Sequence, residues 1–106
     1  MIEIGDKDFK AQVLNASVPA VVFFYADWAG PCNLLRPEIE AVEQAFGNSV
    51  VFSTLNIEDH PHTPIAYQVK GVPALLLFHG GELIASKVGA ISSEQISAWL
   101  AEKGAV

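Results

Sequence analysis

The chain is poor in sulfur and in positive charge. Its 106 residues include one cysteine and one methionine, and six Lys and Arg stand against twelve Asp and Glu, which gives a formal net charge of −6. A single cysteine rules out a disulfide bond within the chain. The acidic balance, with no basic run, argues against nucleic acid or an anionic membrane as a partner.

Long apolar runs are also missing. No stretch approaches the roughly 20 apolar residues that a membrane helix needs. The opening Met-Ile-Glu-Ile-Gly-Asp lacks the basic head and apolar run of a signal peptide. We therefore expect a cytoplasmic protein, and the lone cysteine fits a reducing compartment. His60 and His62 stand close together without a nearby cysteine, so we expect a polar loop there, with no metal site and no cofactor.

The residues that are present favour an α/β domain over residues 1–106. Apolar runs without alternation, such as 20–26, indicate strands buried on both faces. Apolar residues at helical spacing indicate amphipathic helices. Asp6 is expected to cap the first helix, Pro37 to kink the second, and Ser92 with Gln95 to form a capping box on the last. The expected strands are 1–4, 20–26, 50–56, 74–78 and 82–88, and the expected helices are 6–16, 32–46, 64–67 and one that begins after Ser92.

One loop carries a chemical motif. Tyr25-Ala26-Asp27-Trp28-Ala29-Gly30-Pro31-Cys32 resembles the thioredoxin active site and differs from its Trp-Cys-Gly-Pro-Cys at one position. The resemblance continues through Pro37, Leu55-Asn56-Ile57-Glu58, Lys70-Gly71-Val72-Pro73 and Lys87-Val88-Gly89-Ala90. It implies a thioredoxin fold, in which helices flank both faces of a central mixed sheet in three layers. It also implies that Pro73 is cis.

Three positions depart from the family's redox machinery. Ala29 stands where the nucleophilic cysteine belongs, Phe23 where the family usually has a buried aspartate, and Thr54 where a lysine usually pairs with that aspartate. Losing the aspartate alone would leave a buried ammonium without a partner, which costs several kcal/mol. We therefore interpret Phe23 and Thr54 as a joint replacement. Cys32 is expected to be a buried small hydrophobe that reacts slowly.

The leading hypothesis is a thioredoxin, monomeric, that reduces disulfides in other proteins and carries electrons from a thioredoxin reductase. As written it is inactive in dithiol exchange, because Ala29 cannot attack. Ala29 is either the natural residue or an introduced change, and both alternatives stay open. One alternative is a naturally non-catalytic module that binds extended polypeptides or a fixed partner. Another is a one-cysteine enzyme that uses Cys32 against a small oxidant. The expected substrate groove contains Trp28, Ala29, Gly30, Pro31, Val72, Pro73, Gly89 and Ala90.

Overall fold

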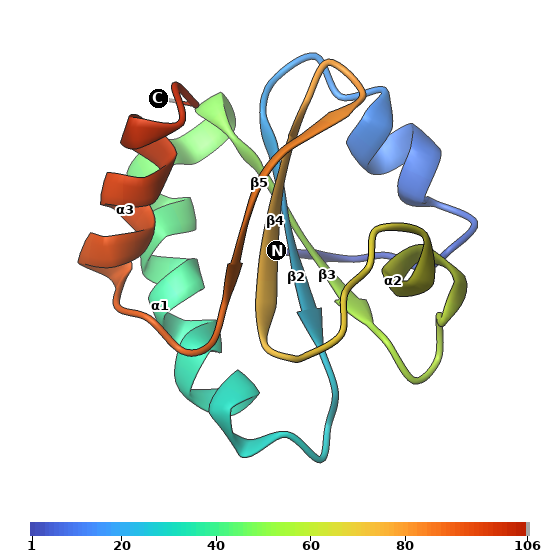
Figure 1. The fold of residues 1–106 in the computed structure, drawn as a ribbon. Coiled ribbons are helices and arrows are strands. Elements are labelled where there is room, and N and C mark those ends of the chain that lie inside the picture. Colours follow the sequence, from blue (N-terminus) through green and yellow to red (C-terminus); the bar gives the residue numbers. More distant parts are fainter. Residues whose placement is uncertain (106) are drawn as a thin grey trace.

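A mixed β-sheet forms the centre of the computed structural model, which describes residues 1–105 (Figure 1). Within these residues the sheet has five strands in the order β1-β3-β2-β4-β5. β1, β3 and β2 run parallel, whereas β4 is antiparallel to β2 and β5 is antiparallel to β4. The strands are β1 (Ile2–Glu3), β2 (Ala20–Tyr25), β3 (Val51–Asn56), β4 (Ala74–His79) and β5 (Glu82–Val88).

The apolar run of β2 divides between two hydrophobic cores. Val21 and Phe23 pack on one face of the sheet, and Val22 and Phe24 pack on the other. All four side chains are buried, because successive residues of a strand point to opposite faces and both faces are covered. This strand leads directly into the loop that resembles an active site.

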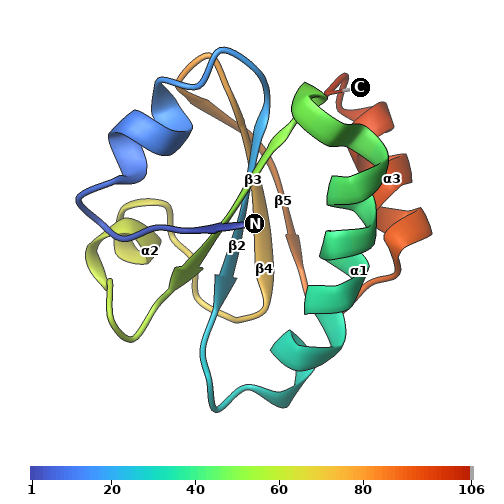
Figure 2. The same ribbon diagram turned by 180° about the vertical axis from the view of Figure 1, so that it is seen from behind.

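Helices cover both faces of the sheet and complete three layers. α1 (Gly30–Phe46) and α3 (Ser93–Glu102) lie on one face, while the π-helix η1 (Lys10–Leu14) and α2 (His62–Ala66) lie on the other, as Figures 1 and 2 show from opposite sides. A short 3₁₀ segment, η2 (Gly47–Ser49), follows α1. The three-layer α/β arrangement expected from the sequence is thus confirmed. Within residues 1–105, no helix has the length and apolarity needed to cross a membrane.

The expectation for the first helix was wrong in both its extent and its cap. η1 spans only Lys10–Leu14, and Phe9 precedes it without a side-chain cap. The Asp6 carboxylate instead accepts hydrogen bonds at the start of α2, from the backbone N–H of His62 (3.2 Å) and from the N–H (2.8 Å) and hydroxyl (2.6 Å) of Thr63. Burial raises the pKa of Asp6, but the hydrogen bonds from Thr63 and His62 together hold the pKa below its ordinary value. Asp6 therefore ties the N-terminal segment to the loop after β3.

Local signals elsewhere were more accurate. Ser92 and Gln95 form the expected capping box on α3. α1 begins two residues earlier than expected, at Gly30, and continues through Pro37. α2 also begins two residues early, at His62.

A register shift between Leu77 and Phe78 interrupts the pairing of β4 with β5. Irregularities of this kind discourage further strand pairing at a sheet edge.

Candidate functional site

The loop after β2 delivers Ala29 to the start of α1. Ala29 is extended (φ −89°, ψ 100°) and no side chain caps the helix. Its N–H donates to the carbonyl of Ala26 (3.2 Å), and its own carbonyl accepts the N–H of Cys32 (3.0 Å). Pro31 lies in the first turn of α1, where its fixed φ suits the helix and its missing N–H costs nothing. Residue 29 therefore sits at a helix N-terminus, the electropositive end that favours a thiolate.

The side chains of this loop differ sharply in exposure. Trp28 is 69% exposed, whereas Ala29 and Cys32 are only 6% and 3% exposed. Trp28 is therefore available to contact a partner, as expected from the motif. The thiol of Cys32 is covered by the same hydrophobic cluster that holds Phe23 and Leu35. This burial supports the interpretation of Cys32 as a packed side chain.

A second loop lies at the same end of the sheet. The peptide bond between Val72 and Pro73 is cis, as the resemblance implied. The carbonyl of Pro73 accepts the N–H of Gly89 at 2.9 Å, so the chain before β4 and the chain after β5 meet here. Gly89 has a φ of +100°, which a residue with a side chain rarely adopts. Ala90 follows it on the exposed side.

Val72 joins the two loops. Its side chain is half-buried and packs against the cluster that contains Ala29 and Cys32. Among residues 1–105, the backbone N–H and C=O of Val72 make no hydrogen bond. The two loops thus place Trp28, Ala29, Val72 and Gly89 at one end of the sheet, together with backbone groups of Val72 that an extended peptide could use. That these residues form a substrate groove stays a prediction.

Beneath the loop, the buried side chain at position 23 is the ring of a phenylalanine. Phe23 is fully buried and stands opposite Thr54 on the neighbouring strand. The Thr54 hydroxyl donates to Glu3 Oε1 at 2.7 Å, and the Tyr25 hydroxyl donates to the same oxygen at 2.9 Å. Burial and this hydrogen bond to Glu3 raise the pKa of Tyr25. Thr54 therefore has a polar partner of its own in Glu3, which the sequence analysis missed.

Arg36 is the other residue that the sequence analysis missed. Its guanidinium carbon lies 5.3 Å from the centre of the Phe23 ring and 4.9 Å from that of Tyr25, within the range of a cation–π contact. Arg36 follows Cys32 by four residues, so both lie on one side of α1. The four-residue spacing from Cys32 was the only sequence feature that could have placed Arg36 near the site. It could not show that the guanidinium of Arg36 lies over the rings of Phe23 and Tyr25 on β2.

His60, in the β3–α2 loop, has structural contacts. Nδ1 of His60 accepts the N–H of Asp6 at 3.3 Å. The His60 ring lies so close to Gly5 that a Cβ there would stand 2.4 Å from Cε1, which explains glycine at that position. In the described part of the chain, no group of three or more His, Cys, Asp or Glu is placed to hold a metal ion.

Comparison with known proteins agrees with this geometry. The family model described as Thioredoxin matches residues 1–102. A thioredoxin of Buchnera aphidicola subsp. Schizaphis graminum is 43% identical over 102 residues, which cover 96% of this chain and 94% of that protein. Thioredoxins of Acidithiobacillus ferridurans and Pseudomonas aeruginosa are 38% and 36% identical, each over 94% of this chain and 93% of their own length. The chain therefore belongs to the thioredoxin family.

Proposed function

We propose that this chain is a thioredoxin-type protein disulfide oxidoreductase whose dithiol chemistry is blocked at Ala29 and whose polypeptide-binding groove is intact. The observation that carries the proposal is the position of Ala29. It occupies the N-terminus of α1, next to the exposed Trp28 and three residues before Cys32. Every other part of the loop, including the Gly30-Pro31 turn, matches a working thioredoxin site.

The blocked step follows from the chemistry of thiol–disulfide exchange. A thiolate at position 29 would attack one sulfur of a client disulfide and form a mixed disulfide, releasing the other client sulfur as a thiolate. The thiolate of Cys32 would then attack the mixed disulfide, release the second client thiol and leave a 29–32 disulfide. A thioredoxin reductase would supply two electrons and two protons to restore the dithiol. The methyl group of Ala29 cannot begin this sequence, and Cys32 has no second thiol to resolve any adduct.

The intact groove favours a second candidate, a module that binds extended polypeptides without changing them. The free backbone of Val72 and the exposed ring of Trp28 support binding whether or not position 29 carries sulfur. We also propose that the protein acts as a monomer in the cytoplasm, where a restored thiol pair would be kept reduced.

The decisive experiment restores the missing sulfur. The chain with Ala29 is expected to give no catalysed reduction of insulin by dithiothreitol, whereas Ala29→Cys gives a clear rate and accepts electrons from a thioredoxin reductase. Ala29→Ser is the matched control, since it adds an atom of similar position without a thiol. The oxidoreductase proposal fails if Ala29→Cys forms the 29–32 disulfide and is inactive in both assays.

Binding is measured separately with carboxymethylated insulin B chain, an extended polypeptide that has no free thiol. Of the two tryptophans, Trp28 is exposed and Trp99 is buried, so a change in fluorescence on binding reports the groove. The native chain and Ala29→Cys are expected to bind with similar affinity. Trp28→Ala, followed by calorimetry, is expected to weaken binding. If the native chain does not bind, the groove is not used and the binding-module candidate is wrong.

A further inference from the structure

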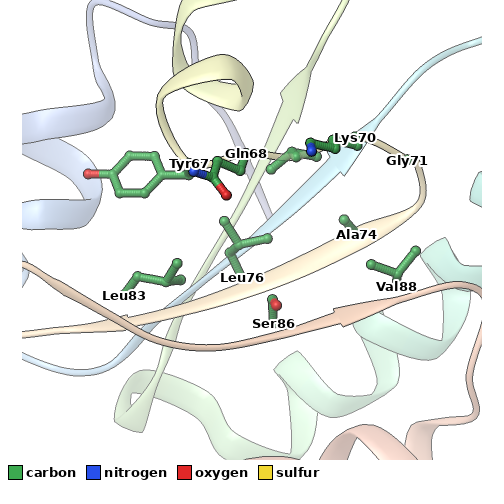
Figure 3. Close-up of a pocket in the computed structure, with 10 residues that line it drawn as sticks. Tyr67, Gln68, Lys70, Gly71, Ala74, Leu76, Leu83, Ser86 and Val88 are labelled. Carbon is green, nitrogen blue, oxygen red and sulfur yellow. The ribbon is translucent and has the colours of Figure 1, made fainter.

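A small hollow lies beside the proposed groove, on the opposite face of the β4–β5 hairpin from α1 and α3 (Figure 3). Its volume is about 70 Å³, enough for a small aliphatic group. Residues 67–71, between α2 and β4, form one wall, Ala74 and Leu76 form the floor, and Leu83, Ser86 and Val88 of β5 form the other wall. The face is settled by strand pairing, because Ser86 pairs with Leu76, which belongs to the core under η1 and α2.

Two of the three β5 residues that line this hollow, Leu83 and Val88, are apolar and open to solvent. Val88 is 68% exposed and Leu83 is 41% exposed, although the floor beneath them is buried. Exposed branched side chains around a buried apolar floor are typical of a surface that receives another apolar group. Val88 immediately precedes Gly89, and Gly71 immediately precedes Val72, so the hollow lies next to the proposed groove.

The wall between α2 and β4 offers a cation and unpaired backbone. In the part of the chain that the structure describes, Lys70 makes no ion pair. Over the same part, the backbone N–H and C=O groups of Lys70 and Gly71, like those of Val72, make no hydrogen bond. Three successive residues thus present free main-chain groups along a path from the groove to the hollow. A peptide that hydrogen-bonds to the backbone of Val72 can continue the same pairing with the backbone groups of Gly71 and Lys70.

We propose that this hollow is a specificity subsite for an extended client polypeptide, which takes one aliphatic side chain while a neighbouring client carboxylate pairs with Lys70. The inference rests on the proposed polypeptide-binding function. The lining of the hollow contains no Asp or Glu, and Lys70 is its only cation, so a client carboxylate can pair with Lys70 at short range, although the net charge of −6 repels anions at longer range.

The test uses short synthetic peptides that share one central segment. The first peptide carries Leu-Asp after the segment, and the second carries Leu-Asp before it. The third peptide carries Ser-Asn at both positions. A Leu-Asp peptide is expected to bind about tenfold more tightly than the Ser-Asn peptide, because it buries an aliphatic side chain. Amide NMR shifts at Trp28 and Val72 report the groove, and shifts at Leu83 and Ser86 report the hollow.

Two pairs of variants assign the effect to the hollow. Ser86→Phe fills it and is expected to abolish the preference, whereas Lys87→Phe, next along β5 and pointing to the α1 face with Leu75, leaves the preference intact. Lys70→Glu is expected to weaken the Leu-Asp peptide about twofold to fivefold, and Lys87→Glu is its control.

The outcomes distinguish failure of the proposed subsite from failure of the proposed polypeptide binding. Equal affinity of all three peptides, with shifts at Trp28 and Val72 but none at Leu83 or Ser86, overturns the subsite and leaves the groove. A preference that survives both Ser86→Phe and Lys70→Glu overturns it as well. Absence of any shift at Trp28 and Val72 with all peptides shows instead that the proposed polypeptide binding is wrong.

Discussion

Introducing a carboxylate at position 23 tests whether Phe23 and Thr54 replaced a buried acid–base pair together. Phe23 is fully inaccessible to solvent. Removing a buried phenyl ring typically costs about 3–5 kcal/mol, and Phe23→Asn measures this packing loss without a charge. Phe23→Asp adds the cost of burying a carboxylate, so it is expected to be less stable than Phe23→Asn at neutral pH. Thr54 is only 2% exposed, so Thr54→Lys alone places a buried ammonium opposite an apolar ring and is expected to cost several kcal/mol. The lost hydrogen bond from Thr54 to Glu3 adds about 1 kcal/mol.

The pH dependence of this difference has a definite sign. Burial raises the pKa of the introduced carboxyl above its unfolded value of about 3.9. Between these two pKa values the unfolded chain releases a proton that the folded chain keeps, so folding stability falls as pH rises, by about 1.4 kcal/mol per pH unit. The difference between Phe23→Asp and Phe23→Asn is therefore expected to be small at pH 3 and to widen above pH 4.

The coupling free energy between positions 23 and 54 tests whether Phe23 and Thr54 are a joint replacement. Residues 23 and 54 are direct neighbours on parallel strands, which lie about 4.8 Å apart. An ammonium introduced by Thr54→Lys is expected to recover about 1–3 kcal/mol of the charge penalty at pH 7, and none of the packing loss. Urea denaturation in constant sucrose, which keeps the weakest variant folded, measures all four corners of the cycle.

Two controls complete that experiment. The Phe23→Asn/Thr54→Lys cycle is expected to show little coupling, because it has no charge pair. Arg36→Gln is expected to enlarge the Phe23→Asp penalty, because the Arg36 guanidinium already lies over the Phe23 ring. Coupling within about 0.5 kcal/mol of zero in the Phe23→Asp/Thr54→Lys cycle would show that the two sites do not sense each other, and the idea of a joint replacement would be refuted.

Two further predictions concern other parts of the chain. Asp6→Asn is expected to cost about 1–2 kcal/mol at pH 7. Because hydrogen bonds hold the folded pKa of Asp6 below its ordinary value, that difference is present above about pH 4 and is lost as pH falls through the folded pKa; a difference that does not change with pH in urea titrations would contradict it. Cys32, at 3% exposure, is expected to react slowly with iodoacetamide in the native protein and much faster in urea. Rapid alkylation of the native protein would support the one-cysteine enzyme.

The sequence alone was sufficient for features with a local cause. The apolar run of β2 predicted a strand buried on both faces, since period and composition are local properties. Ser92 and Gln95 predicted their capping box because both partners lie in one helical turn. The loss of dithiol exchange also has a local cause, since it depends on which atoms position 29 has, and it stays a prediction.

Only the tertiary structure could decide the partners of polar groups that lie far apart in the chain. Asp6 was predicted to cap the helix that follows it, but its carboxylate binds the start of α2, 57 residues away at Thr63. A capping residue offers the same acceptor to any helix N-terminus that folding brings within reach, so sequence spacing cannot identify which one it caps. The contacts of Glu3 with Thr54 and of Arg36 with Phe23 have the same origin. They depend on the register of the strands and on where α1 packs, and no periodic pattern in the sequence records either.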